Sequence, residues 1–258
     1  MVGRLPDRSV ARAVTHQRWE QITFLHWRLP AATITPLLPP GLTPHTFDGD
    51  AWLSITPLRM HVRAAFTPPV PHLSHFAEVN VRTYVRGPDG GDGIWFFSLE
   101  CPRLPVVAAL RGLGLPYTLA RTALRTAPDP ARSRQLHPPP RDPDSPARQL
   151  DAGTRRPHGG PGMRSRTTIG ESMEPDEATD FLTGRWSAYT WRFARLWRVD
   201  VDHPPWPLHR AEARADVNEL VLANGLPPVT GEPLVHYSPG VPVRIGLPVR
   251  ARHNGRHG

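Results

Sequence analysis

The side chains best suited to chemistry occupy alternate positions of one short run, Phe76 to Arg86. Successive side chains of a β-strand point to opposite faces, so a single face of this run carries four polar groups: Glu78, Asn80, Arg82 and Tyr84. A guanidinium binds carboxylates bidentately, and a desolvated glutamate with a raised pKa exchanges protons near neutral pH. This face is therefore a candidate site for a small carboxylate or enolate.

A second β-rich run follows after a glycine-dense turn, and the two runs together predict a β-hairpin. With a turn over residues 87–93, Asn80 lies opposite Glu100, and Glu100 joins the polar patch. A slip of one residue reverses what the second strand contributes to that face. Two other interpretations of the patch stay open, namely an internal Arg–Glu pair that holds the sheet together and a solvated face.

Three further residues are candidates for the same site. His26 ends a strand-like run and has a side chain that titrates near neutral pH, although a structural histidine is the commoner role. Arg59 lies in Pro-Leu-Arg-Met-His and faces either a cavity or the outside. Tyr117 is a candidate cavity aromatic, and the alternative for it is ordinary core packing, as for three other aromatic residues: Tyr189, Trp206 and Tyr237.

Composition excludes one reaction class. All 31 basic residues are arginine, so no lysine amine is present to form a Schiff base with a carbonyl substrate. In a helix, the spacing of His72, His75 and Glu78 would place three possible metal ligands on one face. Pro71 and the strand pattern argue against a helix there, so we expect no metal. We also expect no cofactor.

The net charge of +8 raises the question of nucleic acid, but no nucleic-acid-binding motif is present, and we expect no specific nucleic-acid partner. No apolar run approaches the length of about 18 residues that suggests a membrane span, so we expect no membrane partner. The single cysteine, Cys101, has no partner for an internal disulfide and fits a reducing cytoplasm. The oligomeric state is not predicted.

Turn and periodicity signals predict a mostly β chain with a few helices, forming one domain over residues 15–246. Loose termini are expected at 1–14 and 247–258. Residues 127–172 are dense in Pro, Arg, Asp and Gly, and we expect a flexible insert there. Helices are predicted over residues 30–38, 103–113, 175–183 and 216–224. Strand sequence is predicted over residues 16–29, 42–47, 51–62, 76–101, 115–125, 185–201, 208–215 and 234–246.

Several runs, in this order along the chain, resemble the YqjF-like family of uncharacterised bacterial proteins. They include Leu37-Leu-Pro-Pro-Gly-Leu, Thr46-Phe-Asp-Gly-Asp-Ala-Trp, Asn80-Val-Arg-Thr-Tyr-Val, Phe181-Leu-Thr-Gly-Arg-Trp and His203-Pro-Pro-Trp-Pro-Leu. Together the runs cover about residues 16–125 and 180–246. Residues 127–172 do not match the family pattern well.

The resemblance implies the acetoacetate-decarboxylase-like fold, a mostly antiparallel β-barrel or cone around a cavity, with a few helices outside. The polar face of Glu78 to Tyr84 would then look inward. Glu78 is the nearest match to a strand glutamate in the active site of the decarboxylases. Thr118 and Leu119 fall where their Schiff-base lysines would lie, so the resemblance extends to the scaffold and not to the nucleophile.

Two classes of function remain after this reasoning. The first is a small-molecule binder, or an enzyme that works without lysine, acting on a carboxylate or keto acid in a barrel cavity. The alternative is a non-catalytic structural or protein-interaction domain whose barrel interior is filled by side chains. A cavity lined by Glu78 and Arg82 favours the first, and a solid interior favours the second.

Overall fold

The computed structural model of the protein describes residues 9–65, 68–126 and 149–252, and most of the regular structure in these ranges is β. The strands are β1 (Thr15–Leu29), β2 (Thr43–Pro44), β3 (Ala51–Ala64), β4 (His75–Arg86), β5 (Asp92–Cys101), β6 (Tyr117–Leu119), β7 (Arg121–Thr126), β8 (Gln149–Arg155), β9 (Gly162–Ser172), β10 (Ser187–Arg192), β11 (Arg195–Asp202), β12 (His209–Asp216), β13 (Leu234–Ile245) and β14 (Val249–Arg250). The helices are short: α1 (Ala31–Ile34), the 3-10 turn η1 (Thr35–Leu37), α2 (Leu104–Gly112), α3 (Glu177–Thr183) and α4 (Asn218–Leu222).

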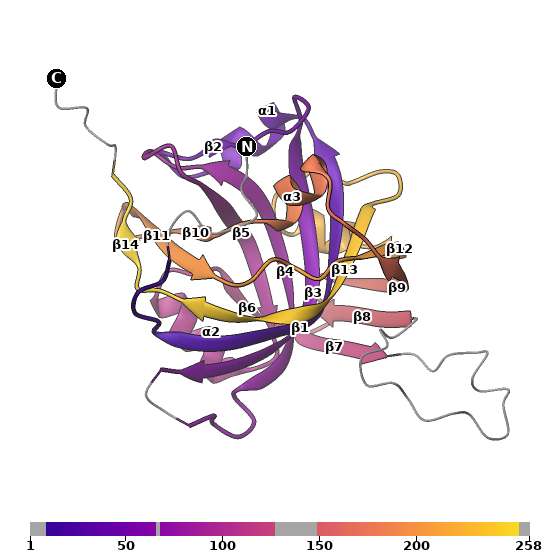
Figure 1. The fold of residues 1–258 in the computed structure, drawn as a ribbon, viewed down its shortest axis with the longest axis horizontal. Helices are drawn as coiled ribbons and strands as arrows, with labels where there is room; N and C mark the ends of the chain where they lie inside the picture. The colour runs from indigo at the N-terminus through magenta and orange to yellow at the C-terminus, as the bar shows by residue number, and fades with distance from the viewer. Residues whose placement is uncertain (1–8, 66–67, 127–148, 253–258) are drawn as a thin grey trace, which may run out of the picture.

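Hydrogen bonding between strands closes the main sheet into a ring (Figure 1). The path runs β11–β10–β5–β4–β3–β1–β13 and returns to β11 through the pairs Val201–Ile245 and Asp202–Arg244. The pairings along this path are antiparallel except for β10 on β5, which is parallel. The predicted class, mostly β with a few peripheral helices, is confirmed.

A branch of the sheet covers one outer side of the ring. Strand β13 pairs with β12 at only two positions, and β12 continues the sheet through β9, β8 and β7. The branch and α4 together pack against the outward-facing side chains of the ring. The apolar core between them includes Leu25, Leu53, Ile55, Met163, Leu220 and Val221. A second core lies on the inner side, where α2 and β6 contribute Val107 and Tyr117.

Strand β4 is buried on both faces, which explains its sequence pattern. Val79 and Val81 point outward into the core beneath the branch. Glu78, Asn80 and Arg82 point the other way, into the ring, and each of them is less than 9% exposed. The alternation of apolar and polar residues therefore separates an outer core from a polar inner wall.

The prediction of a flexible insert over residues 127–172 is wrong for the second half of that segment. Residues 149–172 form β8 and β9, which pair along their length. Buried residues such as Leu150, Ala152 and Met163 alternate with more exposed ones, as expected for strands that are buried on one face. Many of the buried side chains are small and many of the exposed ones are arginine, so the composition of this segment did not reveal the alternation. Residues 127–148 lie outside the described residues.

The expectation of loose ends is also wrong where the structure describes them. Val10 is buried, and its carbonyl oxygen accepts a hydrogen bond of 2.6 Å from Arg244. Near the other end, β14 pairs with β11. Within the described ranges, no helix has the length and apolar character needed to cross a membrane.

Candidate functional site

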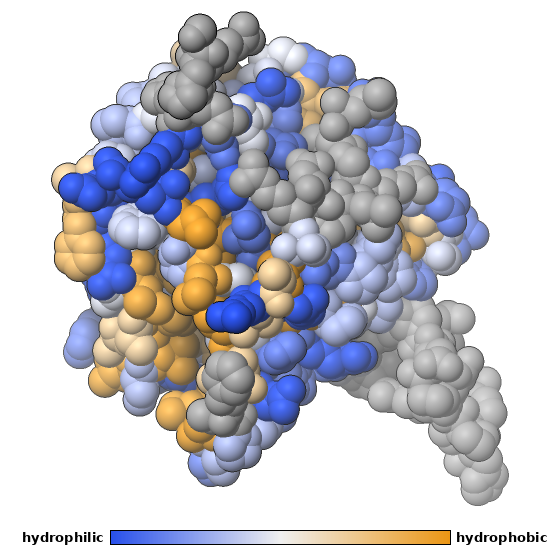
Figure 2. All heavy atoms as spheres, turned by 60° about the vertical axis from the view of Figure 1, so that its left-hand side comes forward, coloured by the Kyte–Doolittle hydropathy of each residue, from blue (hydrophilic) through white to orange (hydrophobic). Residues whose placement is uncertain are grey.

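A cavity of about 230 Å³ lies inside the ring. Most of its wall is apolar and comes from β1, β3, β5 and the residues around Trp206, including Ile22, Leu58, Met60, Phe96, Leu99 and Trp206. Leu113 and Pro248 also line it, so the cavity extends toward the side where α2 and β14 lie. Hydrophobic side chains gather on that face of the molecule (Figure 2).

Three polar side chains of β4 interrupt the apolar wall. Glu78, Asn80 and Arg82 are 2%, 7% and 5% exposed. One polar atom of each, Oε2, Oδ1 and Nε respectively, has no hydrogen-bond partner among the described residues. Because a buried polar group without a partner costs about 1–3 kcal/mol, these three atoms mark a place where a ligand or ordered water is expected to bind.

Burial raises the pKa of Glu78 from 4.5 to about 7, and hydrogen bonds from Tyr117 and Asn80 oppose the rise. Tyr117 comes from β6, which pairs with β5 through Leu99, so the β5–β6 pairing brings the phenol to the carboxyl group. Burial and the neighbouring Glu78 raise the pKa of Tyr117 well above 10. The carboxyl group of Glu78 can therefore gain and lose a proton near neutral pH. The neighbouring phenol of Tyr117 stays protonated.

Arg82 is held in place by aromatic neighbours. Its guanidinium carbon lies 5.5 Å from the ring centre of Phe24, and the side chain hydrogen-bonds to Tyr84. Burial lowers the pKa of Arg82, but the pKa of arginine is ordinarily so high that the side chain keeps its charge at neutral pH. The result is a fixed cation in the same cavity as Glu78.

Tyr84 and His26 are buried behind this site and do not line the cavity. The Tyr84 hydroxyl donates a 2.7 Å hydrogen bond to the carbonyl oxygen of Leu182. The hydroxyl oxygen of Tyr84 also lies 3.3 Å from Nδ1 of His26. Because the hydroxyl proton is donated to Leu182, Nδ1 of His26 is the donor in this second hydrogen bond and the Tyr84 oxygen accepts. Tyr84 therefore supports Arg82, and His26 contacts Tyr84 on the side away from the cavity lining.

The prediction that Glu100 lies opposite Asn80 and joins the polar patch is wrong. Strand β5 begins at Asp92, so the turn is shorter than expected, and a bulge at Phe97 shifts the register between the pairs Val81–Ser98 and Arg82–Phe96. Asn80 consequently faces Leu99, and Glu100 points to the other side of the sheet. There Nη2 of Arg156 donates a 2.8 Å hydrogen bond to the Glu100 carboxylate.

Arg59 also lies outside the cavity, on the face of β3 opposite to Leu58 and Met60. It donates hydrogen bonds of 3.2 Å to Gln21 and to the carbonyl oxygen of Leu124. The alternation of β3 explains this, because the two apolar neighbours of Arg59 occupy the inner face. Of the eight residues predicted to bind a ligand, the structure brings four to the cavity: Glu78, Asn80, Arg82 and Tyr117.

Sequence reasoning missed Arg185 and His203, which both line the cavity. His203 contacts the carbonyl oxygen of Pro204 through Nδ1 at 2.7 Å. Arg185 follows the short helix α3, far along the chain from β4. The signal for both was present, since the Phe181-Leu-Thr-Gly-Arg-Trp and His203-Pro-Pro-Trp runs belong to the family-like pattern, but no local periodicity points to a cavity.

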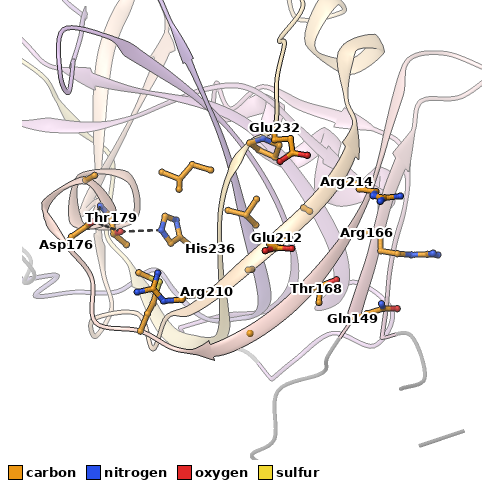
Figure 3. Close-up of a pocket in the computed structure, with 18 residues that line it drawn as sticks. Gln149, Arg166, Thr168, Asp176, Thr179, Arg210, Glu212, Arg214, Glu232 and His236 are labelled. Atoms are coloured by element: carbon orange, nitrogen blue, oxygen red, sulfur yellow. Dashed lines mark hydrogen bonds between the residues drawn. The ribbon is translucent and has the colours of Figure 1, made fainter. Parts of the chain in front are cut away.

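A larger groove of about 1040 Å³ lies outside the ring, between β9, β12 and the start of β13 (Figure 3). Charged side chains of both signs line it: Arg166, Arg210, Glu212, Arg214 and Glu232. Arg166 is already paired with Asp151 at 2.7 Å, and both side chains are largely exposed to solvent. Hydrated charges of mixed sign are common on protein surfaces, so the enclosed cavity is the stronger candidate site.

Comparison with known proteins supports this view of the scaffold. A family model described as an uncharacterized conserved protein (DUF2071) matches residues 16–242. The uncharacterized protein YqjF of Bacillus subtilis is 32% identical over 227 residues, which are 87% of either chain.

Solved structures of the acetoacetate-decarboxylase-like type share the fold. An acetoacetate decarboxylase-like enzyme from Sphingomonas wittichii superposes with a TM-score of 0.63 at 17% identity, over 95% of this chain and 96% of that one. The enduracididine biosynthesis enzyme MppR, complexed with pyruvate, gives 0.60 at 12% identity, over 95% and 93%. An acetoacetate decarboxylase from Legionella pneumophila gives 0.59 at 13%, over 94% and 90%.

Proposed function

Because this chain belongs to the DUF2071 family and has the acetoacetate-decarboxylase-like fold, we propose that it binds a small carboxylate or keto acid in the ring cavity and moves a proton at that ligand. The observation that carries the proposal is the set of unpaired polar atoms on Glu78, Asn80 and Arg82, all facing one cavity. A filled interior, the alternative for this fold, does not fit a cavity of about 230 Å³.

Anion binding is the part assigned to Arg82. Its Nε–H has no partner, and a guanidinium forms short, charge-assisted hydrogen bonds to a carboxylate or enolate oxygen. The apolar wall around it excludes water, which strengthens such a bond, and accommodates the hydrocarbon part of the ligand. The MppR complex with pyruvate shows that a protein of this fold takes a small keto acid, and the same ligand class is proposed for this chain.

Proton transfer is the part assigned to Glu78. With a pKa near 7, its carboxylate is a competent base at neutral pH and its acid form is a competent donor. The proposed step is reversible enolisation of a keto acid. A C–H bond on the carbon next to the ketone breaks, the proton moves to Glu78, and the electron pair moves to the carbonyl oxygen, where Arg82 stabilises the negative charge. Asn80 and Tyr117 hold the carboxyl group in position.

A Schiff base takes no part in this mechanism, because the chain contains no lysine. Borohydride reduction in the presence of a keto acid is therefore expected to leave no adduct on any side chain. A covalent adduct located by mass spectrometry in the folded core would contradict this assignment.

The proposal is tested by hydrogen–deuterium exchange at C3 of 2-oxobutanoate, the carbon next to the ketone, in D₂O, followed by NMR. The protein is expected to accelerate exchange, and Glu78→Gln to lower the rate by about 100-fold or more, in line with the loss of a general base. Glu212→Gln, at an exposed position of β12, is the matched control and is expected to leave the rate unchanged.

Binding is measured separately by calorimetry with the same keto acid. Arg82→Met is expected to weaken binding by at least about tenfold, whereas Arg164→Met, which removes an arginine that is 80% exposed, is not. If Arg82→Met loses binding but the parent protein does not accelerate exchange, the protein is a binder and not an enzyme. The absence of both would overturn the proposed function.

A further inference from the structure

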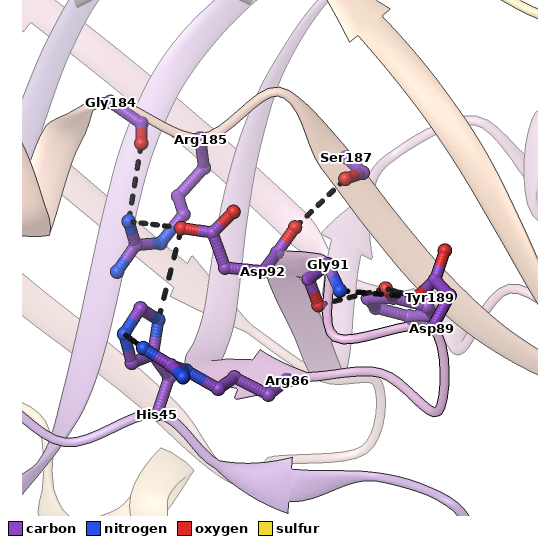
Figure 4. A network of polar contacts seen from close by, with 9 residues as sticks. All are labelled: His45, Arg86, Asp89, Gly91, Asp92, Gly184, Arg185, Ser187 and Tyr189. Carbon is purple, nitrogen blue, oxygen red and sulfur yellow. Dashed lines mark hydrogen bonds and ion pairs between the residues drawn. The ribbon is translucent and has the colours of Figure 1, made fainter. Parts of the chain in front are cut away.

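Arg185 places a second guanidinium at the cavity, and no sequence pattern assigns it a role. It comes directly after Gly184, the residue that ends α3 (Figure 4). Its side chain is 1% exposed. It lines the same cavity as Arg82 and Glu78. An arginine buried to this extent normally has most of its donors paired.

The partners of Arg185 use only one of its nitrogen atoms. Nη1 lies 3.3 Å from the carbonyl oxygen of Gly184 and 3.5 Å from the carboxylate of Asp92. Nε and Nη2 have no hydrogen-bond partner among the described residues. The same Asp92 oxygen also lies 3.9 Å from Nδ1 of His45 (Figure 4), and at 3.5 Å from Arg185 it is a distant counter-charge.

Aromatic rings fix the position of this guanidinium. Its carbon atom lies 4.3 Å from the ring centre of Phe181 and 4.9 Å from that of Tyr84. Because Tyr84 also hydrogen-bonds to Arg82 through its hydroxyl group, one tyrosine holds both arginines, one at its face and one at its tip. Burial lowers the pKa of Arg185 to about 10, and the positive charges of Arg82 and Arg86 contribute to the lowering.

Charge balance follows from this arrangement. Two guanidinium groups border the cavity, and Glu78, with a pKa near 7, supplies only part of one negative charge at neutral pH. Asp92 offsets part of the charge of Arg185 from outside the cavity lining. A ligand with one carboxylate at Arg82 would leave Nε and Nη2 of Arg185 buried and unpaired, which is unfavourable for a charged group.

We propose that Arg185 is a second anion subsite, so that the ligand class of this cavity is a small dianion, such as a dicarboxylate or a keto acid with two acidic groups. One acidic group binds to Arg82 beside Glu78, and the other binds to the free nitrogens of Arg185. This inference rests on the proposed function and narrows its ligand class.

A purely structural role for Arg185 is the competing explanation, since it contacts Phe181 and Tyr84 and lies near Asp92. Such a role needs the cation over the rings and Nη1 near Asp92. It gives no reason for two further donor nitrogens to be buried without partners. The structural role therefore predicts that ligand charge is irrelevant, and the subsite predicts that the second charge is recognised.

The experiment is calorimetry with a series of unbranched dicarboxylates, malonate, succinate, glutarate and adipate, each compared with the monocarboxylate of equal carbon number. Monomethyl glutarate has the same chain length as glutarate and lacks one of its charges. We expect the best dicarboxylate to bind at least about tenfold more tightly than its monocarboxylate, and Arg185→Met to abolish that ratio while changing monocarboxylate binding less than about twofold.

Arg185→Lys keeps a positive charge and is the second variant, used if the methionine variant does not fold, as judged by circular dichroism. It is expected to keep part of the preference for two charges. Equal binding of dicarboxylates and monocarboxylates by the parent, or an equal loss of both ligands in Arg185→Met, would overturn the subsite but leave the proposed function standing. If the parent binds neither class, both proposals fail.

Discussion

Tyr117 donates a hydrogen bond to Glu78 inside the ring, although the two residues come from strands that are not neighbours in the sheet. Strand β5 lies between β4 and β6 and pairs with both. The contact joins the carboxyl group to a phenol that does not ionise near neutral pH. It lies in the polar part of a largely apolar cavity, where burial of Glu78 makes its ionisation measurable as a change in stability.

Replacement of Glu78 by glutamine is expected to change how stability depends on pH. Burial raises the folded-state pKa of Glu78 from 4.5 to about 7, so the unfolded chain ionises first. The neutral form favours folding, and this advantage is complete below about pH 4.5 and is lost as the pH rises through about 7. Relative to Glu78→Gln, the parent is expected to lose about 3 kcal/mol of unfolding free energy across that window.

Urea unfolding of both proteins at several pH values measures this difference. The comparison removes the contribution of other titrating groups, because they are shared. Glu212→Gln, at an exposed position, is expected to follow the parent at every pH. Parallel curves for the parent and Glu78→Gln would show that the carboxyl group is not desolvated.

Replacement of Tyr117 by phenylalanine is expected to move the same transition to higher pH. The phenol stabilises the ionised carboxylate, and its removal raises the pKa of Glu78 further. The loss of one hydrogen bond to a charged group corresponds to roughly one pKa unit. Tyr237→Phe, which removes a hydroxyl from the separate core cluster around Leu150, is the control. A midpoint that stays in place, or moves down, would contradict the hydrogen bond.

The polar wall of the cavity was predictable because it follows from one local rule. Glu78, Asn80 and Arg82 alternate with valines, and alternation within a single strand requires no knowledge of the rest of the chain. The same rule shows that they share a face, but not that the face is enclosed. Enclosure comes from β6, α2 and the residues near Trp206, which reach the ring only in the folded chain.

Glu100 and Arg185 show where local rules end. The position of Glu100 depends on one additional residue at Phe97, and a bulge has no reliable signature in a run of apolar residues. Arg185 lies after a short helix whose contact with the cavity is purely tertiary. For β8 and β9, buried threonine, serine and alanine take positions that a search for large apolar residues does not detect.

Replacement of Arg156 by methionine is expected to destabilise the fold strongly. Its partner Glu100 is 0% exposed, so the variant leaves a buried carboxylate without its cation, which costs about 3–5 kcal/mol. The matched control is Arg166→Met, which breaks an exposed pair with Asp151 and is expected to leave the stability nearly unchanged. Urea unfolding measures both. Similar losses in the two variants would mean that Glu100 is solvated.

Leu58 and Arg59 provide the sharpest test of which face of β3 looks into the cavity. Leu58 lines the cavity and lies opposite Glu78 in the strand register, whereas Arg59 bonds to Gln21 and Leu124 on the other face. Leu58→Phe adds volume inside the ring and is expected to weaken binding of a keto acid by about tenfold or more.

Arg59→Met, one residue away, is expected to keep the affinity within about twofold and to cost about 1 kcal/mol of stability for its lost hydrogen bonds. Calorimetry gives the affinities, and urea unfolding gives the stabilities. The opposite pattern, with binding lost in Arg59→Met and retained in Leu58→Phe, would invert the assignment of the two faces. In that case the ligand would have to bind outside the ring.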